Sequence, residues 1–257
     1  MMGFGLDVES QLWALLFVMV RVGAALVAAP VFGAVSVPVT VRISLSGAVG
    51  VLALGSTGVQ PPTDLFALAT FLSVAAEALV GLALGFVLQI AFAAPVIASE
   101  VIGAPMGIGF ASAIDPQNGR STPALGNFLQ ILLTLLFLAA DGHLVLVELI
   151  VRSYELLPPG AAWLSPDRLK NIALFGGYAF MAGMLLALPV GFILVSLNLV
   201  VGMLSRSAPS LNLFAVGLPA SLAVGVVALA VGLPVMGDYM VVIVREALDA
   251  AQRLVLG

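Results

Sequence analysis

Residues 171–205 read NIALFGGYAFMAGMLLALPVGFILVSLNLVVGMLS and contain no charged side chain over 35 positions. About 20 apolar residues already span a hydrocarbon core about 30 Å thick. A straight helix of this length would reach about 50 Å, which is longer than that core. Two alternatives follow for this segment. In the first, Pro189 and the Gly176–Gly177 pair bend the segment into two helices that form a hairpin. In the second, the helix stays continuous and leaves the plane of the membrane, unlike a simple membrane-spanning helix.

The rest of the chain has the same apolar character. Hydrophobic residues make up 62% of the 257 positions and charged residues 9%, whereas a soluble domain has about 45 to 50% and about 25%. So few charges cannot coat the surface of a water-soluble globule. We therefore expect an all-α, polytopic membrane-type protein with about six long apolar helical segments, near residues 12–29, 43–58, 66–94, 123–151, 172–204 and 213–235.

Composition also excludes several kinds of chemistry. With no cysteine and one histidine, disulfides, thiolate catalysis and multi-histidine metal sites are excluded. The net charge of −4, without a Lys/Arg cluster, argues against a nucleic-acid partner. Asp141 and His143 are two residues apart, so on a helix they point about 200° away from each other and form no catalytic pair. Because no nucleophile, paired-carboxylate or nucleotide motif is found elsewhere, we predict that the protein is not an enzyme and has no cofactor.

Small residues mark one face of the third segment. Gly81 and Gly85 form a GxxxG motif, and Glu77, Gly81, Gly85 and Gln89 follow a ridge of i+4 spacing that we expect to contact another helix. We interpret Glu77 as a packing carboxylate that forms a hydrogen bond to another helix. The alternative is that Glu77 is a functional charge within the membrane. Arg21 is read in the same way, as an interhelical anchor.

The C-terminal residues from Asp238 onward have an amphipathic pattern. One helical face carries an apolar row and the opposite face a polar row. The apolar row is Val241, Val244, Leu248, Ala251 and Val255, and the polar row is Arg245, Asp249 and Gln252. This helix either lies on the membrane or packs on its own protein, or it docks a partner.

The most unusual stretch is 102–123, IGAPMGIGFASAIDPQNGRSTP. We expect its glycines and prolines, from Gly103 and Pro105 onward, to interrupt any helix, while Met106, Ile108 and Phe110 keep it apolar. Irregular backbone is tolerated at membrane depth only inside protein or along a water-filled cavity. The stretch is therefore a candidate gate or filter loop, with the tight turn at 115–119. A reentrant connector without a gating role is the alternative.

Four patches along the chain carry a resemblance to a known family. They are Arg21 with Pro30, Val31, Phe32, Pro38 and Arg42; residues 109–128; residues 136–160, with Asp141-Gly142-His143 and Leu157-Pro158; and residues 205–219. In this order and spacing they resemble the FliR/SctT family of type III secretion export-gate proteins. The FliR members are flagellar and the SctT members serve injectisomes. One departure is Asp141, where family members often have Asn.

The resemblance implies a fold and a function. The fold is a single FliR-like export-gate domain over 1–257, in which a FliP-like portion (1–170) precedes a FliQ-like helical hairpin (171–257) with the amphipathic C-terminal helix. The function is that of a core subunit of the flagellar type III export gate. It is assembled in the bacterial inner membrane, at the flagellar basal body, with FliP-like, FliQ-like, FlhB-like and FlhA-like partners. The cargo is unfolded polypeptide.

The loop at 106–122 corresponds to the family's pore plug. The plug and gate residues implied by the resemblance are Met106, Gly107, Ile108, Gly109, Phe110, Asp115, Pro116 and Gly119. Two other functions stay open: an injectisome export-gate subunit, and a small-molecule or ion transporter with its site at 103–116. A transporter predicts inverted sequence halves and a buried charged substrate site.

Overall fold

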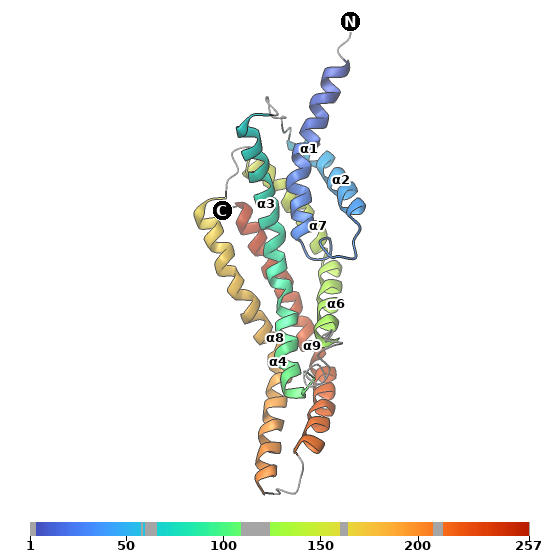
Figure 1. Ribbon diagram of the computed structural model, residues 1–257, viewed down its shortest axis with the longest axis vertical. Coiled ribbons are helices and arrows are strands. Elements are labelled where there is room, and N and C mark those ends of the chain that lie inside the picture. Colours follow the sequence, from blue (N-terminus) through green and yellow to red (C-terminus); the bar gives the residue numbers. More distant parts are fainter. Residues whose placement is uncertain are drawn as a thin grey trace. The chain divides into compact units, whose positions relative to one another are not determined.

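The computed structural model describes residues 4–57, 59, 66–108, 124–159, 164–207 and 213–256, and it is helical with no strand in these ranges (Figure 1). The predicted all-α class is confirmed. The helices, in chain order, are α1 (Phe4–Ala28), α2 (Val39–Thr57), α3 (Leu68–Phe92), α4 (Ala94–Met106), α6 (Ala124–Ala139), α7 (Gly142–Leu156), α8 (Pro166–Ser207) and α9 (Leu213–Leu256).

Within the described residues, five helical stretches are long and apolar enough to cross a membrane. They lie at Val8–Ala28, Val39–Thr57, Leu68–Met106, Pro166–Ser207 and Val216–Leu256. A sixth is formed if α6 and α7, which are bent by 65° at their junction, count as one span. The expected number of about six apolar segments is therefore confirmed.

The longest apolar run forms one continuous helix. The 42 residues of α8 pass through Gly176, Gly177 and Pro189 without a break, so the hairpin-like alternative is wrong. In apolar surroundings the intrahelical hydrogen bonds have no competitor, and a proline removes only one of them. The 44-residue α9 likewise passes through Pro219 and Pro234.

Breaks occur at other positions than the sequence suggested. The segment expected at 123–151 is divided at Asp141, whose φ of 54° lies in the left-handed region and ends helical continuity between α6 and α7. Conversely, Gly103 and Pro105 do not interrupt α4, which continues to Met106. Helix α4 ends at Gly107, with φ 73°. The expectation of irregular backbone from residue 102 onward is thus wrong for 102–106.

The chain divides into two compact units. The first comprises Met1–Ile90, Leu138–Gly176 and Arg245–Gly257, and the second comprises Ala91–Phe137 and Gly177–Val244. In the first unit α1 packs against α2 and α7, and α2 also contacts α7.

The end of α9 belongs to the first unit. Its inner face buries Ala247, Ala251, Leu254 and Val255. The polar row at Arg245, Asp249 and Gln252 is exposed, which confirms the amphipathic pattern. Arg168, near the start of α8, donates a hydrogen bond of 3.4 Å to the carbonyl of Val255. The inner face is therefore packed on its own protein, as one of the alternatives predicted.

In the second unit, small residues bring α4, α8 and α9 close together. Helices α8 and α9 run antiparallel, because Gly232 of α9 lies beside Val190 of α8 while Ser221 of α9 hydrogen-bonds Asn198 of α8. Helix α4 lies against α8 at Gly183, where an added Cβ would be 2.7 Å from the Cβ of Ile97. Glycine thus sets the spacing of these helices.

The contact at Gly183 gives a first prediction. Gly183→Ala places a methyl group within 2.7 Å of Ile97 and 2.9 Å of the Ala94 carbonyl. We expect it to lower the free energy of unfolding by about 1–3 kcal/mol, as overpacking does. The control is Gly202→Ala in the same helix, where an added Cβ has no atom of the described part of the chain within 4 Å. Thermal unfolding in detergent, followed by circular dichroism, measures both, and equal stabilities would contradict the close α4–α8 contact.

Candidate functional site

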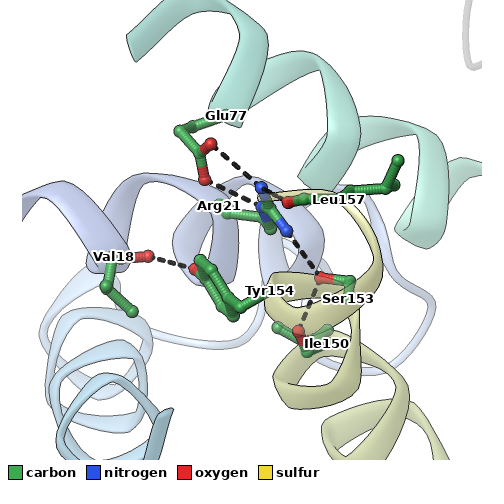
Figure 2. A network of polar contacts seen from close by, with 7 residues as sticks. All are labelled: Val18, Arg21, Glu77, Ile150, Ser153, Tyr154 and Leu157. Atoms are coloured by element: carbon green, nitrogen blue, oxygen red, sulfur yellow. Dashed lines mark hydrogen bonds and ion pairs between the residues drawn. The ribbon is translucent and has the colours of Figure 1, made fainter. Parts of the chain in front are cut away.

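A fully buried ion pair joins α1 to α3. Arg21 and Glu77 have side chains that are 0% exposed. The guanidinium donates two hydrogen bonds to the carboxylate, from Nε to Oε2 at 2.8 Å and from Nη2 to Oε1 at 2.9 Å (Figure 2). This two-point geometry matches the planar fork of arginine to the two carboxylate oxygens.

Helix α7 and Leu157, the residue that follows it, supply the remaining partners of Arg21. Nη1 donates to the Ser153 hydroxyl at 2.9 Å, and Nη2 donates to the Leu157 carbonyl at 2.9 Å. The guanidinium carbon lies 4.2 Å from the centre of the Tyr154 ring. The hydroxyl of Tyr154 in turn donates to the Val18 carbonyl at 2.7 Å. Figure 2 shows these contacts surrounding a single guanidinium group.

This network explains how two charges are tolerated in the interior. Arginine has five N–H donors, and Arg21 makes four hydrogen bonds with them. Two of these go to the negatively charged carboxylate of Glu77. A buried pair of this kind is stable only if its geometry is good and its remaining donors are satisfied. The network therefore fixes the mutual arrangement of α1, α3 and α7, and it offers no free charge to a substrate.

One turn after Glu77, glycines let α3 touch the backbone of α1. A Cβ added at Gly81 would clash with the Arg21 carbonyl and lie 2.9 Å from the Ala24 Cβ. At Gly85 it would clash with the Ala25 carbonyl. Gln89, which shares the i+4 spacing, is exposed. Each i+4 step turns a helix by about 40°, so three steps rotate the ridge by about 120° and carry Gln89 off the contact face.

The link between α1 and α2 is strained and held by Arg42. Val31 has φ 69°, which is an outlier for a β-branched residue, and the N–H of Phe32 closes a three-residue turn onto the Pro30 carbonyl at 2.8 Å. Arg42 donates to the carbonyls of Phe32 at 3.0 Å and Ala34 at 2.6 Å. Val31, Phe32 and Arg42 belong to the first of the four patches that carry the family resemblance. In the structure they fix the turn between α1 and α2.

The structure describes only the beginning of the predicted plug. Met106 is buried in the last turn of α4, against Gly225 of α9. Gly107 follows in the left-handed conformation, and Ile108 is 40% exposed. The remaining predicted plug residues lie outside the described ranges: Gly109, Phe110, Asp115, Pro116 and Gly119.

Asp141 and His143 are placed at the junction of α6 and α7. Asp141 is exposed and precedes α7, its carbonyl accepting the N–H groups of Leu144 and Val145. His143 is partly buried in the first turn, and its Nδ1 has no hydrogen-bond partner among the described residues. Asn and Asp are the residues that best tolerate left-handed backbone. Asp at position 141 is therefore compatible with the left-handed conformation that the bend requires.

Several residues of these sites were not singled out from the sequence. They are Ser153 and Tyr154 beside Arg21, and Asn198 and Ser221 near the end of α4. A signal existed for Asn198, because an amide within a long apolar helix predicts a hydrogen bond to another helix. No group of His, Asp and Glu side chains within the described residues is arranged to hold a metal ion.

The buried ion pair gives a second prediction. Glu77→Gln removes the negative partner and leaves a buried guanidinium, so we expect a loss of about 3–5 kcal/mol in the free energy of unfolding. The double variant R21M/E77M removes both charges and is expected to lose less. The control is Arg152→Gln, whose exposed partner Glu148 is 3.4 Å away and whose effect should be about 0–1 kcal/mol. Denaturation in detergent ranks the three, and a similar loss in all of them would contradict the role of burial.

The glycine contact gives a third prediction. Gly81→Leu with Gly85→Leu forces α3 away from the backbone of α1. The chain should still insert into the membrane, because insertion needs only hydrophobicity, but its yield of folded protein after extraction in detergent should fall by about tenfold or more, because the overpacked α1–α3 contact is unstable. Gly55→Leu is the matched control, since no atom of the described residues lies within 4 Å of a Cβ at that position. Normal yield from the double variant would mean that α1 can move aside without consequence.

Comparison with known proteins identifies the family. Residues 12–247 match the family described as bacterial export proteins, family 1. A flagellar biosynthetic protein FliR from Escherichia coli K12 is 34% identical over 227 residues, covering 88% of this chain and 85% of the relative. Those from Pectobacterium carotovorum and Bacillus subtilis are 36% and 33% identical over 230 residues, covering 90% and 87% of this chain and 88% and 87% of the relatives. The chain therefore belongs to the FliR family of bacterial export proteins.

Proposed function

We propose that this chain is a core subunit of the flagellar type III secretion export gate, at the flagellar basal body in the bacterial inner membrane. Family membership and the apolar helices support this assignment. The matched relatives named above are flagellar biosynthetic proteins, which favours the flagellar system over the injectisome alternative.

The length of α8 carries the proposal that the chain works within a hetero-oligomer. Its 42 residues extend about 60 Å as a helix, whereas the hydrocarbon core is about 30 Å thick. Large apolar side chains are exposed along much of it, including Phe180, Phe192 and Met203. Lipid cannot cover apolar surface beyond the core, so protein must cover part of it. FliP-like and FliQ-like subunits fill this role in the proposed channel, next to FlhB-like and FlhA-like components.

The loop at 106–122 is proposed to plug this channel at rest. The start of the loop supports this proposal. Helix α4 ends at Met106, the left-handed conformation of Gly107 redirects the chain, and the apolar Ile108 is the first exposed residue after that turn. Glycines let such a loop fill a pore and move aside, while apolar side chains such as Phe110 seal it against ions without specific chemistry. Met106, buried on α9, belongs to the anchored end of the loop.

The proposed mechanism is passive gating of a channel for unfolded flagellar proteins. The chain has no nucleotide-binding motif, so the energy for export comes from other components of the apparatus. The transporter alternative requires a buried charge that is available to a substrate. Among the described residues, the buried charges Arg21 and Glu77 are occupied by each other and by α7.

Shortening the loop tests the function. Deleting residues 108–113, or replacing Phe110 with Ala, should raise the permeability of cells to ions and small solutes when the whole complex is expressed, because the seal is lost. Permeability is measured by dye entry and by growth on media with a toxic small solute. A deletion of equal length within 55–64 is the control and should leave permeability unchanged.

Assembly is checked separately by co-purification of a tagged chain with the FliP-like and FliQ-like subunits. A deletion variant that assembles in normal amount and leaks no more than wild type would make the loop a connector. A purified chain that runs as a stable monomer and transports a small molecule by itself would favour the transporter instead.

A further inference from the structure

A cavity of about 200 Å³ lies in the first compact unit, where α8 begins and α9 ends. Val87 lines it from α3, and the rest of its described lining comes from α8 and α9. Sites for drug-sized ligands have about 300–1,000 Å³. This cavity therefore suits a headgroup or another small part of a larger molecule.

The lining follows one face of each of the two long helices. On α8 it occupies positions i, i+3, i+4 and i+7 counted from Arg168, and on α9 positions i, i+3 and i+4 counted from Ala250. Nη2 of Arg168 donates a hydrogen bond of 3.4 Å to the Val255 carbonyl, so the start of α8 lies beside the end of α9. Arg168 and Arg253 are in the first turn of α8 and the last turn of α9. Both arginines therefore line the cavity at the same helix ends.

The side chains of the lining are cationic and apolar. Of the eight described lining residues, two are arginines, one is an asparagine, five are apolar and none is acidic. The hydrogen bond to Val255 uses one donor of Arg168, and its other side-chain donors have no partner in the described part of the chain. Arg253 lies 3.7 Å from the Glu246 carboxylate, too far for a good hydrogen bond, and its side chain is 68% exposed. Both guanidinium groups can therefore bind the oxygens of an anion.

The place of the cavity along α8 matches a membrane surface. The charge-free run of 35 residues begins at residue 171, directly after Arg168 and Lys170. Both α8 and α9 contain stretches that are long and apolar enough to cross a membrane. Arginines that flank such a stretch lie at the level of the lipid headgroups. From there, the apolar lining on α8 continues toward the level of the acyl chains as far as Phe175.

We propose that this cavity binds one anionic phospholipid. The phosphate contacts Arg168 and Arg253, and the first part of an acyl chain lies against Val87, Ile172 and Phe175. Basic pockets between transmembrane helices bind anionic headgroups in this way. The apolar lining favours a lipid over a free anion, because it offers a free anion no hydrogen bond. The bound lipid touches α3, α8 and α9 at once and so holds the two helix ends against α3. This inference does not depend on the proposed channel or on its plug.

The test measures lipid binding to the full chain, purified in detergent with its co-purifying subunits. Phosphatidylglycerol is titrated in, and native mass spectrometry measures the lipid-bound fraction. Phosphatidylcholine is the zwitterionic comparison, and inorganic phosphate tests a free anion. Each arginine contributes about fivefold to the binding of an anionic lipid surface. We therefore expect R168Q/R253Q to bind phosphatidylglycerol about 20- to 30-fold more weakly, and to bind phosphatidylcholine as wild type does.

Two further variants separate the cavity from general surface charge. The control R152Q/R245Q removes two exposed arginines of the same unit that do not line the cavity, and it should bind phosphatidylglycerol like wild type. Ala250→Phe fills the cavity without changing any charge and should also weaken binding. If this variant does not fold, the arginine variants decide, because they replace one highly exposed side chain and one that makes a single long hydrogen bond.

Four results would overturn the proposal. Equal binding of phosphatidylglycerol by R168Q/R253Q and by R152Q/R245Q would show that the lipid binds elsewhere. Equal affinity of wild type for the two lipids would show that the site does not select an anion. Displacement of phosphatidylglycerol by inorganic phosphate at equal concentration would make the site one for a free anion. Binding by the isolated chain that is lost when the subunits are present would show that a partner protein covers the cavity.

Discussion

An arginine and a glutamate, both without exposed surface, hold α1, α3 and α7 together. Their burial is unfavourable unless each donor and each carboxylate oxygen has a partner, so the position of these helices is restricted to the one in which all contacts form. The glycine contact joins the same two helices as the ion pair. Gly81 and Gly85, one and two turns after Glu77, let the backbone of α3 lie directly against that of α1.

A second constraint acts in the other compact unit, where hydrogen bonding to the backbone replaces charge. Small residues at Gly183 and Gly225 allow α4 to lie close to α8 and α9. Asn198 then supplies a hydrogen bond to the carbonyl that the helix end leaves unpaired. In both units a close backbone contact through glycine is combined with a specific polar contact. Packing sets the distance between helices, and the polar group sets their position along each other.

The clearest differences between expectation and structure concern glycine and proline. In water these residues end helices, which led to the expectation of a break at 102–106 and a possible bend at Pro189. In an apolar chain the backbone has no other partners, and α4 and α8 continue through them. The real break between α6 and α7 occurs at Asp141, a charged residue that adopts left-handed backbone. Gly142 follows it. The break could be located from the sequence only by giving the charged Asp141 more weight than the helix-breaking tendency of glycine and proline elsewhere.

The sequence alone determined the helical membrane class, the number of apolar segments, the family and the ridge at Gly81 and Gly85, because these follow from composition and from spacing along one helix. It also marked Arg21 and Glu77 as unusual charges. Their pairing across 56 residues, the contributions of Ser153, Tyr154 and Leu157, and the contact of Asn198 with Pro105 were decided only by the tertiary structure. The physical reason is that a polar group in an apolar interior must find a partner, while helix periodicity fixes only the face it points from. Which distant group meets that face depends on how the helices pack.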